Sequence, residues 1–232
     1  MKVENKMKKK ERSTFSKVFD PKMWLNDFVR FTGILPVAID LRIKKTYINK
    51  TKDLYKGKYI ISSNHISFID PVIIMASFWM RRVGFLATTE LFESKTANFL
   101  FKQFGCVPID RNNPGVESFK KVADMLNRGH LMCVFPEGTV VHDDELGAFK
   151  SGIVMMAVMA EADLLPVYIP ERTNRWKRQH VIIGEKVSYK DYVKGPFPTM
   201  EDLNKVTSVL LEKELELKNK YLESQKKKNK EN

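Results

Sequence analysis

Short apolar segments alternate with longer amphipathic segments from about residue 58 to the C-terminus. The apolar segments are typical of buried strands and cover residues 58–62, 83–88, 106–109, 131–135, 164–169 and 180–189. The segments with helical periodicity cover residues 71–82, 90–104, 115–128, 149–162 and 199–222. Strands that alternate with helices form sheets covered by helices, so the pattern predicts an α/β fold with a mostly parallel central sheet flanked by helices.

Residues 15–45 form a separate piece, in which an apolar stripe recurs at helical spacing. The stripe consists of Trp24, Phe28, Phe31 and Leu35, with Lys22, Asn26, Asp27 and Arg30 on the other side. Gly33 and Pro36 interrupt this pattern, so two short helices are expected. The stripe either packs on its own domain or lies in a membrane interface. We expect residues 1–45 to be a basic tail with an amphipathic helical membrane-association segment, and residues 46–232 to be the α/β domain, which ends in a charged helix at about 199–222.

The charge of the chain suggests an anionic partner. The formal net charge is +12, and both ends are rich in lysine, over residues 1–12 and 225–232. Such ends are either solvated tails or a polybasic contact with an anionic phospholipid membrane. No nucleic-acid-binding motif appears, and no apolar run is long enough to span a bilayer. Cys106 and Cys133 give no sign of a disulfide framework, which fits a reducing compartment. Together with the basic ends, this leads us to expect a peripheral protein on the cytoplasmic face of a membrane.

Polar side chains follow several of the expected strands. His65 and Asp70 come after the first strand, Arg111 follows residues 106–109, and Glu137, Gly138 and Thr139 follow residues 131–135. In α/β sheets, ligands bind outside the carboxyl ends of the strands, so these groups are candidates for one site. Each also has a purely structural explanation, such as a helix cap, a loop histidine, a surface charge or a glycine turn.

The pair His65 and Asp70 requires a particular local structure. On a single helix, side chains five residues apart would point in different directions. Asp70 followed by Pro71 predicts a helix that starts there, with Asp70 as its N-cap and residues 66–69 as a turn. That turn would bring the histidine back to the carboxylate, so capping and catalysis are compatible.

Taken together and in order, the motifs resemble those of the glycerolipid acyltransferases, the family that includes 1-acyl-glycerol-3-phosphate acyltransferase. The matching stretches are NHISFID, GCVPIDR, FPEGT, FKSG with Lys150, and LLPVYIP, and the resemblance covers about residues 45–190. One departure follows Thr139, where many family members have arginine or serine and this chain has Val140. The acidic cluster at 142–145 is expected to be an exposed polar loop, not a metal site.

The resemblance implies transfer of a fatty acyl group from acyl-CoA or acyl carrier protein to the sn-2 hydroxyl of 1-acyl-glycerol 3-phosphate, which gives phosphatidate. It assigns His65 as the general base and Asp70 as its support, with direct transfer and no acyl-enzyme. It places the lysophospholipid acceptor at Arg111, Lys150 and the 137–139 loop. No metal or organic cofactor is implied, and the acyl donor is a co-substrate.

Two alternatives remain open from the residues alone. The same chemistry could act on another acceptor, such as glycerol 3-phosphate or a different lysophospholipid. A non-catalytic basic protein that binds membrane or nucleic acid would also explain the charge, although it would not explain why the polar clusters follow strands.

Overall fold

The computed structural model describes residues 23–48, 54, 56–110, 114–136, 151–172, 174, 176–193 and 198–230. Its strands are β1 (Lys44–Tyr47), β2 (Tyr59–Ser63), β3 (Val83–Thr88), β4 (Val107–Ile109), β5 (Leu131–Val134), β6 (Asp163–Tyr168) and β7 (His180–Ile183). Within these residues the strands form one sheet in the order β1-β7-β6-β2-β5-β3-β4. β6 and β7 pair antiparallel, and every other neighbouring pair is parallel. The sheet is therefore mixed, with β2 near its centre.

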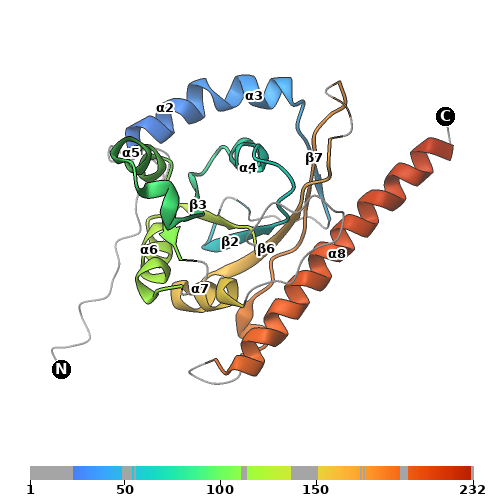
Figure 1. Ribbon diagram of the computed structural model, residues 1–232. Helices are drawn as coiled ribbons and strands as arrows, with labels where there is room; N and C mark the ends of the chain where they lie inside the picture. The colour runs from blue at the N-terminus through green and yellow to red at the C-terminus, as the bar shows by residue number, and fades with distance from the viewer. Residues whose placement is uncertain are drawn as a thin grey trace.

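Helices cover both faces of this sheet (Figure 1). The helices are α2 (Trp24–Thr32), α3 (Ile34–Asp40), α4 (Asp70–Ser77), α5 (Lys95–Gln103), α6 (Val116–Asn127), α7 (Gly152–Ala160) and α8 (Met200–Lys230), with short 3₁₀ turns at Thr89–Phe92 and Tyr189–Asp191. Side chains alternate across β2: Ile60 packs into the cluster formed with α6, α7 and α8, whereas Ile61 packs into the cluster on the α4 side. Burial on both faces explains why these strands are almost entirely apolar.

Several predicted boundaries differ from the structure. β1 was not predicted, because its sequence KKTY is polar and the strand is mostly exposed at the edge of the sheet. The helix predicted at 71–82 ends at Ser77, and the last helix runs on to Lys230. Near the middle of α8, the buried Glu214 accepts a hydrogen bond of 2.5 Å from the Ser62 hydroxyl on β2, which holds this long helix against the sheet.

The N-terminal segment forms two short helices as predicted, and they break at Gly33. Their orientation is unusual, because the polar side of α2 is buried. Asp27 accepts hydrogen bonds from Arg82 Nε at 2.9 Å and Nη2 at 2.8 Å, and Arg30 Nη2 lies 3.0 Å from the same carboxylate. Burial lowers the pKa of Arg30, and the neighbouring Arg82 lowers it further, while Asp27 opposes both effects.

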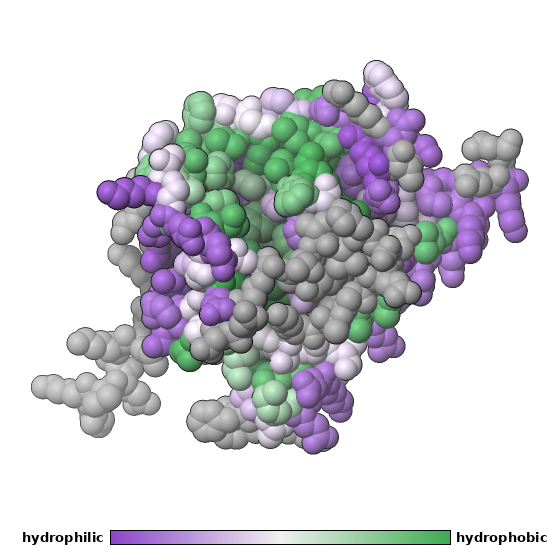
Figure 2. All heavy atoms as spheres, viewed as in Figure 1, coloured by the Kyte–Doolittle hydropathy of each residue, from purple (hydrophilic) through white to green (hydrophobic). Residues whose placement is uncertain are grey.

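The apolar side of α2 therefore faces outward. Trp24, Phe28 and Phe31 are 54%, 59% and 48% exposed; the side chain of Leu35 lies outside the described part of the structure. Figure 2 shows a broad hydrophobic area over the region where Figure 1 places α2, α3 and α4. Among the described residues, no helix combines the length and apolar composition that crossing a bilayer requires.

Candidate active site

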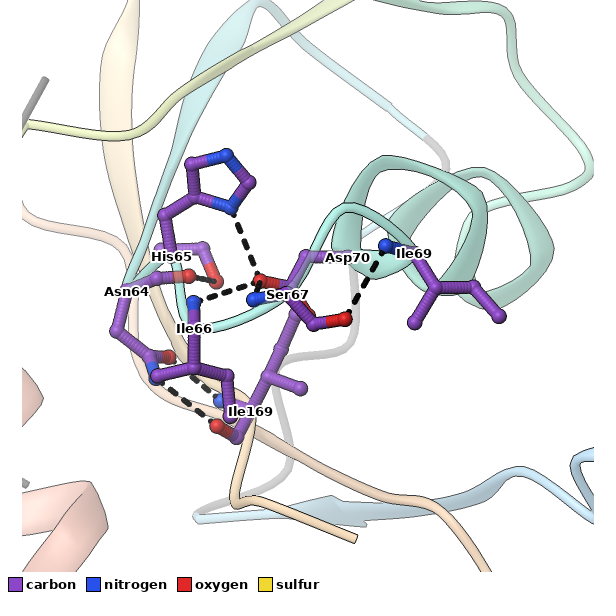
Figure 3. Close-up of polar contacts among 8 residues, drawn as sticks. Asn64, His65, Ile66, Ser67, Ile69, Asp70 and Ile169 are labelled. Atoms are coloured by element: carbon purple, nitrogen blue, oxygen red, sulfur yellow. Dashed lines mark hydrogen bonds and ion pairs between the residues drawn. The ribbon is translucent and has the colours of Figure 1, made fainter. Parts of the chain in front are cut away.

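His65 lies in a short turn between the end of β2 and the start of α4. His65 Nδ1 lies 3.0 Å from Asp70 Oδ2, the carboxylate is buried, and the imidazole is 17% exposed (Figure 3). With Nδ1–H donating to the carboxylate, Nε2 is left to accept a proton from a substrate. The turn at residues 66–69 is the one that the Asp-Pro sequence predicts.

Asp70 holds this turn in a different way from the prediction. The N-cap of α4 is Ile69, and Asp70 is the first helical residue, so the expected N-cap role is wrong. Its Oδ2 atom instead accepts hydrogen bonds from the backbone N–H groups of Ile66 at 2.8 Å and Ser67 at 2.7 Å. One carboxylate oxygen therefore receives the imidazole and two loop amides, which fixes the histidine relative to α4.

A buried asparagine fastens the same loop to the neighbouring strand. Asn64 Nδ2 donates to the Ile169 carbonyl at 2.9 Å, and the Ile169 N–H donates to Asn64 Oδ1 at 2.8 Å (Figure 3). Ile169 follows β6 directly, within the motif LLPVYIP. The proline-bearing motif thus contributes backbone groups that position the residue before His65. Asn64 was not predicted as a site residue, although an amide at the end of an apolar strand could have indicated a buried contact.

Within the described residues, the FPEGT motif contacts the site through Phe135, its first residue. The ring of Phe135, which follows β5, stacks on the His65 imidazole with centroids 4.2 Å apart and an interplanar angle of 18°. The other predicted site residues, Arg111, Glu137, Gly138, Thr139 and Lys150, lie outside the described residues. Their binding roles stay predictions.

The glycine of GCVPIDR has a structural role. Gly105 has a φ of +73°, which favours glycine, and its carbonyl oxygen would lie 2.3 Å from a Cβ built on Gly84. A side chain at Gly84 would require movement of the backbone at Gly105, whereas a side chain at Gly105 would be strained by the positive φ and would displace the end of Met125. This part of the motif therefore sets how the chain approaches β3 before it enters β4.

Neither cysteine has the properties of a nucleophile. Burial raises the pKa of the Cys106 thiol to about 12. The pKa of the Cys133 thiol is raised well above its ordinary value, mainly by burial and also by the nearby carboxylates of Glu214 and Asp70. The thiolate is the reactive form, so both groups are inert near neutral pH. Among the described residues, no three His, Cys, Asp or Glu side chains gather as potential metal ligands; the cluster at 142–145 lies outside them.

Comparison with known proteins decides the family. A model of the family described as Acyltransferase matches residues 42–170, which is more than half of the chain. The chain belongs to the acyltransferase family. The family match includes His65, Asp70, Asn64 and Ile169, so the bonded cluster described above lies within the family domain.

Individual acyltransferases support this placement. The chain is 27% identical over 191 residues to the 1-acyl-sn-glycerol-3-phosphate acyltransferase of Bacillus subtilis, covering 80% of this chain and 94% of that protein. It is 31% identical over 141 residues to a probable enzyme of the same name from Mycoplasma pneumoniae, covering 57% and 53% of the two chains. The crystal structure of the acyltransferase PlsC from Thermotoga maritima has the same fold, with a TM-score of 0.59, 20% identity, and coverage of 85% of this chain and 80% of that one.

Proposed function

We propose that this acyltransferase moves a fatty acyl group from a thioester donor to the sn-2 hydroxyl of 1-acyl-sn-glycerol 3-phosphate and forms phosphatidate. The observation that carries the proposal is the His65–Asp70 pair, with Nδ1 held at 3.0 Å from the buried carboxylate. The names of the relatives in Bacillus subtilis and Mycoplasma pneumoniae support this acceptor.

The reaction needs a base, because a neutral alcohol is a weak nucleophile. His65 Nε2 takes the proton of the hydroxyl as its oxygen attacks the thioester carbonyl, and Asp70 stabilises the resulting imidazolium. The tetrahedral intermediate collapses with cleavage of the carbon–sulfur bond. The departing thiolate takes the proton from the imidazolium, so the products are the ester and a free thiol, and the histidine is again neutral.

The acceptor phosphate requires a cation. Arg111 carries a planar guanidinium suited to two-point contact with phosphate, and Lys150 adds a second positive charge. Glu137 would repel phosphate, so its suggested partners are a glycerol hydroxyl or Arg111 itself. Replacement of Arg111 by alanine is expected to raise KM for the phosphate-bearing acceptor while KM for the donor stays close to normal.

Contact with the membrane is the second part of the proposal. The acceptor and the product are lipids, and Trp24, Phe28 and Phe31 present aromatic side chains on the outer side of α2. Aromatic side chains favour the membrane–water interface, and the basic segment before residue 23 would add attraction to anionic lipid. We place the enzyme peripherally on the cytoplasmic face of a membrane.

One assay tests the proposed function. The purified full chain is incubated with an acyl thioester and, separately, with lysophosphatidate, glycerol 3-phosphate and other lysophospholipids, and the lipid formed is identified by mass spectrometry. The expected product is phosphatidate from lysophosphatidate. Preferential acylation of glycerol 3-phosphate or another lysophospholipid would replace the proposed acceptor. An absence of transfer to every acceptor would overturn the enzymatic function.

A further inference from the structure

A basic groove opens on the β1–β7 side of the sheet, lined by residues of β1, α8 and the segment between β6 and β7. It has a volume of about 660 Å³, within the range of about 300–1,000 Å³ that is usual for small-ligand sites. Its cationic lining residues are Arg42, Lys44, Arg172, Lys177, Arg178 and Lys228. Glu171 is the single carboxylate among the residues lining this groove in the described part of the chain. The groove therefore favours a ligand with several negative charges.

The topology places this groove at the same edge of the sheet as His65. Ser63 at the end of β2 pairs with Val167 on β6, and the next residues of the two chains are joined through Asn64 and Ile169. Pro170 follows directly and lines the groove. β7 runs antiparallel to β6, and β1 runs parallel to β7, so the first residues of β7 and β1 lie at this edge as well.

The distance across the sheet is small. Neighbouring strands are about 4.8 Å apart, so β7 and β1 lie roughly 10 Å and 14 Å from β2. A flexible arm of about four residue-sized units, extended at roughly 3.5 Å per unit, covers that distance. A ligand held over β7 and β1 can therefore place the end of such an arm at the catalytic histidine.

The groove also offers aromatic surfaces. Trp176, which is 77% exposed, and Tyr221 line it together with the cations. Aromatic rings stack on nucleobases, and arginine and lysine side chains bind phosphates, so this mixture suits a phosphorylated nucleoside better than a simple anion. Figure 2 shows a hydrophilic area that begins where the hydrophobic area over α2–α4 ends, near the segment that enters β7.

The groove cations lie close to His180, the first residue of β7, which lines the same space. Burial lowers the pKa of its imidazole, and the neighbouring charges of Lys44, Lys228 and Arg178 lower it further. These cations come from β1, α8 and the segment before β7, so three separate elements direct positive charge into one space.

We propose that this groove binds the nucleotide end of a coenzyme A-type acyl donor, with its phosphates on the groove cations, its base against Trp176 or Tyr221, and its thioester arm extended to His65. The proposal rests on the proposed acyl transfer and specifies its donor. A protein carrier has no nucleobase to stack, and membrane headgroups would use the cations but not the aromatic rings. Both are outcomes of the test.

The test compares two matched pairs of charge reversals. Arg178→Glu with Lys228→Glu changes two exposed groove cations, and Lys120→Glu with Arg128→Glu makes the same change on and just after α6, which packs on the opposite half of the sheet. Binding of coenzyme A and adenosine 3′,5′-bisphosphate is measured by calorimetry. The groove pair should weaken both by about tenfold or more, because each reversal removes a cation and places a carboxylate beside the ligand phosphates. The control pair should bind as the wild type does.

Kinetics separate this proposal from the proposed function. For the groove pair, KM for acyl-CoA should rise, while KM for the nucleotide-free thioester S-acyl-pantetheine should not change. Unchanged affinity for coenzyme A in the groove pair, or an equal loss in the control pair, would overturn the donor site. Failure of the wild type to transfer from either thioester, despite normal coenzyme A binding, would instead refute the acyl transfer.

Two further measurements cover the remaining explanations. If the groove pair does not fold, as judged by thermal melting, Trp176→Ala replaces it, because this side chain is mostly exposed. Trp176→Ala should weaken binding of coenzyme A more than binding of a nucleotide-free pantetheine thioester, and an unchanged affinity for coenzyme A would overturn the donor site. If the groove pair loses binding to anionic phosphatidylglycerol vesicles but keeps its coenzyme A affinity, the groove binds headgroups and the donor site is wrong.

Discussion

The carboxylate of Asp27 receives a two-point contact from Arg82, at 2.9 and 2.8 Å, with both side chains almost completely buried. These residues stand 55 positions apart in the chain, and their contact fastens α2 to the segment before β3. An amphipathic helix usually buries its apolar side. Here the polar side is buried instead, and the aromatic side is left for contact with something other than this domain.

Removal of the carboxylate should destabilise the protein strongly. Asp27→Ala leaves Arg30 and Arg82 buried beside one another without their anion, so the free energy of unfolding should fall by about 3–5 kcal/mol. Urea titration followed by circular dichroism measures this change. The triple variant Asp27→Leu, Arg30→Met, Arg82→Met removes all three charges and should be closer to the wild type in stability. A triple variant as unstable as Asp27→Ala would show that the loss comes from packing rather than unpaired charge.

The His65–Asp70 pair, proposed as the general base and its support, should be essential for turnover and dispensable for folding. His65→Ala should lower kcat by about 10²–10⁴-fold through loss of the general base. Asp70→Asn keeps the shape of the side chain but cannot stabilise the imidazolium, so it should also reduce kcat severely. Steady-state kinetics on variants with a normal circular dichroism spectrum provide the measurement. Full activity of Asp70→Asn would show that Asp70 has only a structural role in the turn.

Asn64 should act as a positioning residue rather than a catalytic one, because its side chain contacts the backbone of Ile169. Asn64→Ala leaves the N–H and carbonyl of Ile169 without their partner, which should cost about 1–3 kcal/mol of stability. The loop that carries His65 becomes less well fixed, so kcat should fall while KM for both substrates changes little. Ser63→Ala serves as the control, because it leaves both contacts of the Asn64 side chain in place. An equal drop in kcat for the control variant would count against this role.

Thiol reagents should not inhibit the folded enzyme. With a pKa of about 12 at Cys106 and full burial of Cys133, almost no thiolate is present at pH 8. Iodoacetamide treatment at that pH should leave activity unchanged, and mass spectrometry should find both cysteines unmodified. The same treatment in denaturant should modify both. Rapid inactivation of the folded protein with alkylation of Cys106 would point to an acyl-enzyme route.

The outward aromatic side of α2 should control attachment to lipid. Trp24→Gln with Phe28→Gln and Phe31→Gln changes exposed side chains only, and is therefore a cleaner test than deletion of residues 1–45, which would leave Arg82 without Asp27. The triple variant should cosediment poorly with anionic vesicles and lose activity on bilayer lysophosphatidate. Activity on a short-chain, water-soluble acceptor should be retained.

The matched control for this variant is Val116→Gln with Met159→Gln and Leu215→Gln, which alters exposed apolar positions on α6, α7 and α8. It should bind vesicles as the wild type does. High salt should release the wild type only in part, because apolar contacts are not screened. If the α2 variant binds vesicles as well as the wild type does, the attachment site lies in another part of the chain.

The order of strands and helices could be predicted because most strands are buried on both faces and are continuously apolar. β1 could not, since its edge position leaves KKTY polar and exposed. The turn between His65 and Asp70 followed from local rules, because Asp-Pro restricts where a helix begins. Which groups the Asp70 carboxylate would contact depended on the path of residues 64–67, and local rules favoured a helix cap instead.

Long-range contacts were beyond the sequence pattern. Asn64 and Ile169 are 105 positions apart, and nothing in either segment alone specifies the other. Asp27 and Arg30 were recognised as the polar side of a helix, but a polar side is normally the solvated one. The ion pair with Arg82 is what buries this side of the helix, and Arg82 is one of two consecutive arginines that nothing in the sequence distinguishes. The basic groove likewise requires β1, β7 and α8 to be assembled before its charges meet.

The inverted orientation of α2 also affects how the purified protein behaves in solution. Trp24, Phe28 and Phe31 cannot turn inward, because the opposite side of their helix is already fixed by buried charges. In plain buffer, the same surface of another copy can cover these rings. Concentrated samples should therefore form assemblies that mild detergent or lipid disperses. The apparent mass in light scattering should fall when the buffer contains detergent or lipid that covers the exposed side of α2.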